Sequence, residues 1–144
     1  MASNLKPRSP KIQVERVHGP ARRKITQGLR EANRLVFGKA QWRPLTITLR
    51  EGRSIVGGVY GWSFVGWLYI AVLWVSDDLR DRGLGRKLMR RVESEARQQG
   101  VKNIFLDTFS FQAPGFYAKL GYREFGRLKN FPVGHRRIYL TKEL

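Results

Sequence analysis

A continuous apolar run at residues 67–75 constrains the fold more than any other feature of this sequence, because it is typical of a strand covered on both faces. It passes through a polar turn, with glycines at positions 83 and 85, into a segment of helical periodicity. The apolar residues of that segment recur every four positions, at Leu84, Leu88, Val92 and Ala96. This predicts a helix ending at Gly100, followed by an apolar strand at residues 104–106. A strand, a helix and a strand of these lengths form a βαβ unit, whose strands are parallel.

The segments on either side of this unit predict an α/β fold. Strand-like patterns occur at residues 11–17, 45–49, 54–63, 122–128 and 136–141. Helical patterns occur at residues 20–38, where the spacing is amphipathic, and at residues 113–120. We therefore expect a single domain over residues 11–144, preceded by a flexible basic tail at residues 1–10.

The composition narrows the chemistry that such a domain can perform. The 144 residues include no cysteine and only two histidines, which excludes thiolate nucleophiles and leaves too few ligands for a histidine-rich metal site. No segment is long and apolar enough for a membrane span, and the basic start of the chain has no signal-peptide core, so we expect a cytoplasmic protein. The net charge of +17 predicts attraction to anions such as cofactor phosphates, acidic substrates, nucleic acids or an anionic membrane surface.

The turn after the apolar run has the chemistry of a phosphate-binding site. The first N–H groups of a helix have no partner within it and lie at the positive end of its dipole. Gly83 and Gly85 remove side chains that would keep a diphosphate away, and three arginines supply charge, namely Arg80, Arg82 and Arg86. The two glycines could instead serve only as a turn. The turn lacks both the G-x-x-x-x-G-K-[ST] and the G-x-G-x-x-G patterns, which argues against nucleotide hydrolysis and dinucleotide redox chemistry.

Arg80, Gly83 and Gly85 match the motif [QR]-x-x-G-x-[GA], and at these residues the sequence resembles the GNAT superfamily of N-acyltransferases. The resemblance extends over residues 11–141 and includes a later F-Y-A-K-L-G-Y segment at residues 116–122. It implies the GNAT fold, a mixed central sheet of about six to seven strands with helices on both faces. In that fold two neighbouring parallel strands splay apart, and the pantetheine arm of CoA bonds to the free backbone of the first.

The resemblance implies an acetyl-CoA-dependent N-acetyltransferase, an acyltransferase in which a primary amine attacks the acetyl group directly within a ternary complex. The cofactor-binding residues would be Leu73, Trp74, Val75, Arg80, Asp81, Arg82, Gly83, Leu84, Gly85 and Arg86. Ser110 would join them, because it stands where many members carry a cofactor-binding asparagine. A backbone N–H near Val75 would stabilise the oxyanion.

Tyr117 and Asp107 are the catalytic candidates. The first tyrosine of the later segment contacts the CoA sulfur in the family and often acts as general acid, so Tyr117 is expected both to bind the cofactor and to protonate the thiolate. Many relatives carry an acidic base on the central strand, where this chain has Ala71. The base is then expected to be Asp107 on the facing strand, Glu31 or a water chain, although Asp107 could instead be paired with an arginine.

Two other functions are compatible with the sequence. The basic tail and the basic start of the first helix allow a nucleic-acid-binding module, although no nucleic-acid fold signature is present. Ala71 allows a CoA-binding relative without catalysis. For an enzyme, the positive charge favours a small amine acceptor that carries an acid group, with neither a metal nor a membrane as partner. The terminal strands could also pair across a homodimer, as edge strands do.

Overall fold

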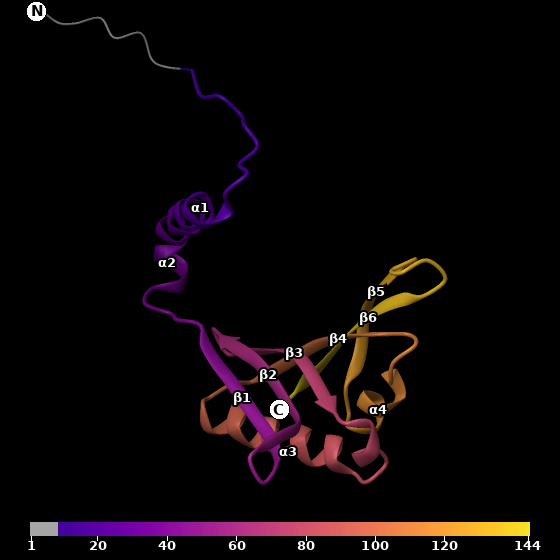
Figure 1. Cartoon of the computed structure of the whole chain (residues 1–144). Helices are drawn as coiled ribbons and strands as arrows, with labels where there is room; N and C mark the ends of the chain where they lie inside the picture. Colours follow the sequence, from indigo (N-terminus) through magenta and orange to yellow (C-terminus); the bar gives the residue numbers. More distant parts are fainter. Residues whose placement is uncertain (1–8) are drawn as a thin grey trace, which may run out of the picture. The chain divides into compact units, whose positions relative to one another are not determined.

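The computed structural model describes residues 9–144, which form two compact units, residues 9–39 and Ala40–Leu144 (Figure 1). The first unit contains helix α1, His18–Ala32, and a short helix α2, Arg34–Phe37. The amphipathic spacing correctly predicted this helical segment. No helix within the described residues is long and apolar enough to cross a membrane.

The strand predicted at residues 11–17 is wrong. The segment forms neither strand nor helix, and Ile12 and Val14 are exposed. A strand needs a partner for its backbone N–H and C=O groups, and alternation of side chains does not supply one. The predicted tail at residues 1–10 lies mostly outside the described residues, and the single domain over residues 11–144 stays a prediction.

The second unit is built around a six-stranded mixed sheet. Its strands are β1 (Arg43–Glu51), β2 (Ser54–Phe64), β3 (Trp67–Val75), β4 (Asn103–Phe109), β5 (Arg123–Lys129) and β6 (Arg136–Glu143). They lie in the order β1-β2-β3-β4-β6-β5, in which β3 and β4 are parallel and the other neighbours are antiparallel. The connections include a 3-10 turn η1 (Asp77–Leu79), helix α3 (Leu84–Gln98) and helix α4 (Pro114–Lys119). The predicted α/β fold and its parallel βαβ unit are confirmed.

Helix α3 lies along one face of the sheet and forms the core with it (Figure 1). The apolar residues spaced four apart, with Met89, supply its buried side: Leu88, Met89, Val92 and Ala96. Facing them are Leu68 and Ile70 of β3 and Ile104 and Leu106 of β4, each at most 4% exposed. Burying a side chain of this size stabilises the fold by roughly 1.5–3 kcal/mol. One helix therefore fixes both strands of the parallel pair, whereas a helix on the second face stays a prediction.

A β-bulge at Ala71 interrupts the pairing of β3 with β2. Tyr60 of β2 lies opposite Val72 and Gly61 lies opposite Ile70, so Ala71 has no partner on that strand. A bulge inserts one extra residue and bends the strand that carries it. The carboxyl half of β3 is therefore redirected directly after Ile70.

The bulge changes which residues of the apolar run face the core. Leu68 and Ile70 face the core before it, whereas Leu73 and Val75 pack against the same core after it. Successive side chains of a strand point to opposite faces, so the extra residue turns over the rest of β3. Trp74 consequently points to the other face, where it is 47% exposed. Both faces of β3 therefore carry apolar residues, and within this unit helix α3 covers the face that carries Leu68 and Leu73.

Replacing Gly61 tests the bulge. An added Cβ would overlap the carbonyl oxygen of Tyr69 and lie 3.0 Å from the Cα of Ile70. We expect Gly61→Ala to lower the free energy of unfolding by about 1–3 kcal/mol in chemical denaturation, because the strand must shift. Gly126→Ala is the matched control in β5, where an added Cβ meets no atom within 4 Å. Equal stability of the two variants would contradict this account.

Candidate functional site

The parallel pairing between β3 and β4 ends partway along both strands. Residue pairs join them from Trp67 with Asn103 to Ile70 with Leu106. Beyond these positions β3 pairs with β2, and β4 pairs with β6. Among the described residues, the backbone groups of residues 71–75 that point toward β4 have no strand partner, so a ligand with its own amides can bond to them as a missing strand would. The predicted splayed pair is confirmed.

The turn between β3 and α3 presents backbone N–H groups. Asp81 and Gly83 have left-handed φ values of 59° and 72°, and α3 begins at Leu84. The N–H of Lys87 donates to the carbonyl of Gly83 at 3.1 Å and closes the first turn of the helix. The N–H groups of residues 84–86 precede this bond and have no acceptor among the described residues, as expected at a helix start.

The three arginines of the turn have different surroundings. Arg80 forms an ion pair with Asp77 at 2.8 Å, and its Nε donates to the carbonyl of Val75 at 3.4 Å. Arg82 and Arg86 are exposed and make no hydrogen bond or ion pair with any described residue. Arg80 therefore stabilises the turn, while the guanidinium groups of Arg82 and Arg86 can bind an anion.

Ser76, between β3 and this turn, has a buried hydroxyl with no hydrogen-bond partner in the part of the chain that the structure describes. A buried hydroxyl without a partner costs stability, so its presence calls for a ligand or water. The unpaired strand backbone, this hydroxyl and the free helix N–H groups form one continuous set. They suit an extended ligand with amides along its length and a diphosphate at its end, which is the chemistry of CoA.

Helix α4 brings Tyr117 toward the same opening. A Cβ at Gly85 would lie 3.3 Å from the ring of Phe116, so α4 packs against the first turn of α3. The ring of Tyr117 lies 5.1 Å from that of Phe116. Burial, with a smaller contribution from the negative charge of Asp107, raises the pKa of Tyr117 from 10.0 to about 12. Tyr117 is therefore a protonated phenol within electrostatic reach of Asp107.

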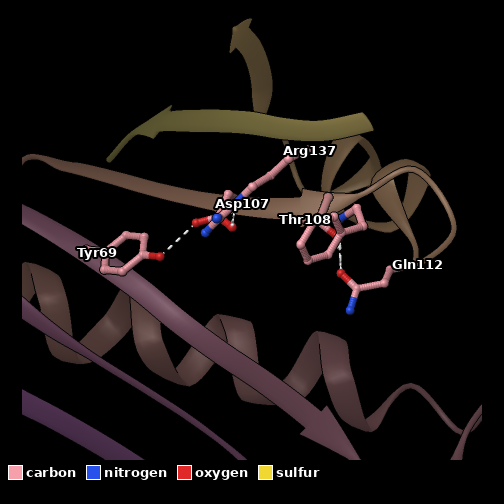
Figure 2. Close-up of polar contacts among 6 residues, drawn as sticks. Tyr69, Asp107, Thr108, Gln112 and Arg137 are labelled. Carbon is pink, nitrogen blue, oxygen red and sulfur yellow. Dashed lines mark hydrogen bonds and ion pairs between the residues drawn. The ribbon is translucent and has the colours of Figure 1, made fainter. Parts of the chain in front are cut away.

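Asp107 is the first residue of β4 beyond the parallel pairing, and both of its carboxylate oxygens are bonded (Figure 2). The Tyr69 hydroxyl donates to Oδ1 at 2.7 Å, and Nε of Arg137 donates to Oδ2 at 2.7 Å. Figure 2 shows Tyr69 reaching from β3 and Arg137 from β6. Burial and the bond to Asp107 raise the pKa of Tyr69 to about 12. The carboxylate is thus paired with an arginine, the alternative that the sequence left open.

Aromatic rings surround Arg137. Its guanidinium carbon lies 5.6 Å from the ring centroid of Phe109, 5.2 Å from that of Phe131 and 5.6 Å from that of Tyr139. A cation at these distances is attracted by the negative faces of the rings. Arg137 is therefore fixed from several sides, and it fixes Asp107 in turn.

The loop after β4 is closed by polar side chains. The N–H of Ser110 donates to the carbonyl of Arg136 at 2.9 Å, and Oγ of Ser110 accepts from the N–H of Arg136 at 3.0 Å. Oε1 of Gln112 accepts from Oγ1 of Thr108 and from the N–H of Phe109, both at 3.0 Å (Figure 2). Ser110 thus joins the loop to β6, and its role in binding a cofactor stays a prediction.

A second tyrosine–carboxylate pair lies on the core side of the sheet. The hydroxyl of Tyr122 donates to Oε1 of Glu93 at 3.3 Å, and Nζ of Lys142 donates to the same oxygen at 2.8 Å. Nζ also donates to the carbonyl of Leu120 at 2.7 Å. Burial, followed by the charge of Glu93 and the bond to it, raises the pKa of Tyr122. These contacts join α3, the end of α4 and β6, so the pair has a structural role.

The structure gathers most of the predicted site around the strand opening. The turn lies at the end of β3, and Tyr117 packs against the core that α3 forms. Asp107 alternates with the buried Leu106, so it points to the opposite face of the sheet. Leu73 and Val75 point into the core, which leaves only their backbone available to a ligand.

One candidate base stays a prediction, and two residues near Asp107 were missed. Glu31 lies in α1, where it accepts a hydrogen bond from Gln27 at 3.0 Å. The sequence distinguishes neither Tyr69, which lies within the apolar run, nor Arg137, which is one of many arginines. The strand register alone could have found Tyr69, because it lies one residue before the end of the parallel pairing.

Comparison with known proteins identifies the family. The model of the acetyltransferase (GNAT) family matches residues 19–122. The chain belongs to this family. It is an acyltransferase, and within residues 9–144 no group of three or more His, Cys, Asp or Glu side chains could hold a metal ion.

Individual acetyltransferases are similar to this chain in sequence and in fold. The blasticidin-S acetyltransferase of Streptomyces morookaense is 37% identical over 107 residues, which cover 71% of this chain and 79% of that protein. An acetyltransferase structure from Bacillus cereus superposes with a TM-score of 0.84 at 31% identity, covering 92% of this chain and 98% of that one. Another, from Bacillus anthracis in complex with acetyl coenzyme A, superposes with a TM-score of 0.63 at 20% identity, covering 71% and 63% of the two chains.

The raised tyrosine pKa values predict a loss of stability in alkali. Between pH 10 and about 12 the tyrosines of the unfolded chain lose protons, while Tyr69 and Tyr117 keep theirs in the folded protein. The folded state then binds more protons, so the free energy of unfolding falls as pH rises through this window. Thermal unfolding measured from pH 9 to 12 should show this fall, and the double variant Tyr69→Phe/Tyr117→Phe should show a shallower one. An equal slope in both proteins would contradict the prediction.

Proposed function

We propose that the protein transfers an acetyl group from acetyl-CoA to the primary amine of a small acceptor, by direct attack in a ternary complex. The observation that carries this proposal is the opening between β3 and β4, with an anion-binding turn at one end and the protonated Tyr117 beside it. When bound, acetyl-CoA supplies the acetyl group as a thioester. The Bacillus anthracis relative in complex with acetyl coenzyme A supports this choice of donor.

We assign the cofactor's binding groups as follows. The N–H groups of residues 84–86, with Arg82 and Arg86, would hold the diphosphate. The backbone groups of residues 71–75 that lack a strand partner would bond the amides of the pantetheine arm, and the Ser76 hydroxyl would gain the partner it lacks. Arg80 and Asp81 would act by shaping the turn.

Tyr117 is the proposed general acid and Asp107 the proposed base. A phenol with a pKa of about 12 keeps its proton at neutral pH and can give it to a departing thiolate. The side chain of Asp107 points to the face of the sheet opposite α3, so Tyr117 and Asp107 would act from opposite sides of the sheet. The thioester would lie in the opening between them.

The acceptor is proposed to be a small amine. The relative named blasticidin-S acetyltransferase supports a small molecule over a protein acceptor. The net charge of +17 favours an acceptor that carries an acid group, because a polycation would be repelled. A screen for acetyl-CoA-dependent CoA release across small amines and peptides tests the proposal. Binding of acetyl-CoA without release in the presence of any amine would contradict it.

Removing the two free arginines should weaken cofactor binding. We expect each of Arg82→Gln and Arg86→Gln to raise the Kd for acetyl-CoA about tenfold, because each removes a charged donor to phosphate. Calorimetric titration measures the change. Arg97→Gln, at the other end of α3, is the control and should bind as the wild type does. Unchanged affinity in the double variant would rule out the assignment of these arginines.

Tyr117→Phe should separate chemistry from binding. The variant keeps the ring that packs against Phe116 but cannot donate a proton to the thiolate. We expect kcat to fall about 100-fold, with little change in the Kd for acetyl-CoA. Steady-state kinetics and calorimetry measure the two effects. Wild-type turnover with a good amine substrate would remove Tyr117 from the mechanism.

A further inference from the structure

We propose that Tyr69 is the catalytic residue that receives the acceptor's proton and relays it to Asp107, with Arg137 as the residue that positions the carboxylate. This inference rests on the proposed acetyl transfer and names the group that meets the amine. The central strand carries Ala71 at the position where many relatives have a carboxylate. The proposal explains how a base on β4 can serve instead.

The contacts of Asp107 make Tyr69 the accessible end of the pair. Only 10% of the Asp107 side chain is exposed, and each of its oxygens already accepts a hydrogen bond. The Tyr69 hydroxyl gives its one proton to Oδ1, and its oxygen keeps lone pairs that can accept from an amine N–H. An amine therefore reaches the carboxylate through the phenol.

The register of the sheet places Tyr69 at the strand opening. Tyr69 pairs with Phe105 in the parallel ladder, and the next pair is the last one before the strands diverge. Its ring lies 4.9 Å from that of Phe105 and 5.1 Å from that of Trp62, so aromatic neighbours hold it on two sides. The hydroxyl reaches across the end of the ladder from β3 to β4, as Figure 2 shows.

Each proton transfer in the proposed reaction has a named donor and acceptor. A neutral amine attacks the acetyl carbonyl carbon, so a C–N bond forms and the C–S bond breaks. The nitrogen gives one proton to Oη of Tyr69, while the original proton of Tyr69 passes to Oδ1 of Asp107. The thiolate sulfur takes the proton of Tyr117. A proton returned through solvent from Asp107 to Tyr117 restores both residues.

Electrostatic coupling between Asp107 and Tyr117 links the two proton transfers. The negative charge of Asp107 contributes to the raised pKa of Tyr117. When Asp107 accepts a proton its charge disappears, so the pKa of Tyr117 falls. The acid on the core side of the sheet thus becomes stronger when the relay on the other side has taken up the amine's proton.

The decisive measurement is chemical rescue of Tyr69→Phe. We expect this variant to lower kcat about 100-fold with a smaller effect on KM, because the proton has no acceptor. Imidazole added at constant pH should restore part of the rate, because an external base can take up the amine's proton in place of the missing hydroxyl. The double variant Tyr69→Phe/Asp107→Asn should be no slower than the slower single variant, as expected of residues that act as a unit.

Tyr122→Phe is the matched control, because it removes another tyrosine–carboxylate hydrogen bond on the core side of the sheet. It should lower the melting temperature but keep wild-type turnover and show no response to imidazole. Wild-type kcat in Tyr69→Phe, or a loss that imidazole does not relieve, would overturn the relay and leave the proposed acetyl transfer intact. Absence of CoA release by the wild type with every amine would overturn both.

A second readout needs no substrate. In the free protein, Asp107→Asn should lower the pH at which Tyr69 and Tyr117 ionise, because both lose a negative neighbour. Ultraviolet absorbance of tyrosinate follows the titration, after thermal unfolding has shown that the variant is folded. An unchanged titration in the folded variant would overturn the coupling. If Asp107→Asn does not fold, Tyr69→Phe and its rescue decide the question alone.

Discussion

The short parallel ladder between β3 and β4 is the constraint on which the rest of the site depends. Helix α3 buries Leu68 and Ile70 of one strand and Ile104 and Leu106 of the other, so the two strands are fixed where they pair. Beyond this anchor, β3 is redirected by its bulge and β4 follows β6. A longer ladder would satisfy the backbone groups of β3 and leave nothing for a ligand to bond. The opening therefore exists because the buried contacts stop where they do.

The ladder also divides the chemistry between two faces. Tyr117 packs on the side of α3, in an apolar environment that keeps it protonated. Asp107 lies one residue beyond the last buried position of β4, so strand alternation turns it to the other face. Arg137 is held there by three aromatic rings and can fix the carboxylate without being free to bind elsewhere. The proposed acid and the proposed base thus lie near one opening without contact between their side chains.

Much of this fold follows from the sequence, because its helices and strands bury one side and therefore carry a periodic pattern. The spacing of α3 was sufficient to predict the βαβ unit, while the anion site at the glycines of its turn stays a prediction. The bulge was not predicted, since a run that is apolar at every position has no break in alternation that would mark the extra residue. The hydrogen-bond partners of Asp107 could not be predicted from the sequence either. Tyr69 is 38 residues away along the chain and Arg137 is 30 residues away, and the register of the sheet brings both to Asp107. The strand at residues 11–17 failed because alternation does not provide a partner.

The bulge at Ala71 has a consequence for how this chain can vary. Its geometry is set by the backbone of β3 and by Gly61 across from it, and the methyl group of Ala71 takes no part in the pairing. Many side chains can therefore occupy position 71 without disturbing the sheet. Deletion of that one residue is different: Leu73 would still face the core in a regular alternation, but the extra residue that bends β3 would be lost. Position 71 therefore tolerates substitution but not deletion. Its side chain can vary with the proposed acceptor, while the number of residues in the strand stays fixed.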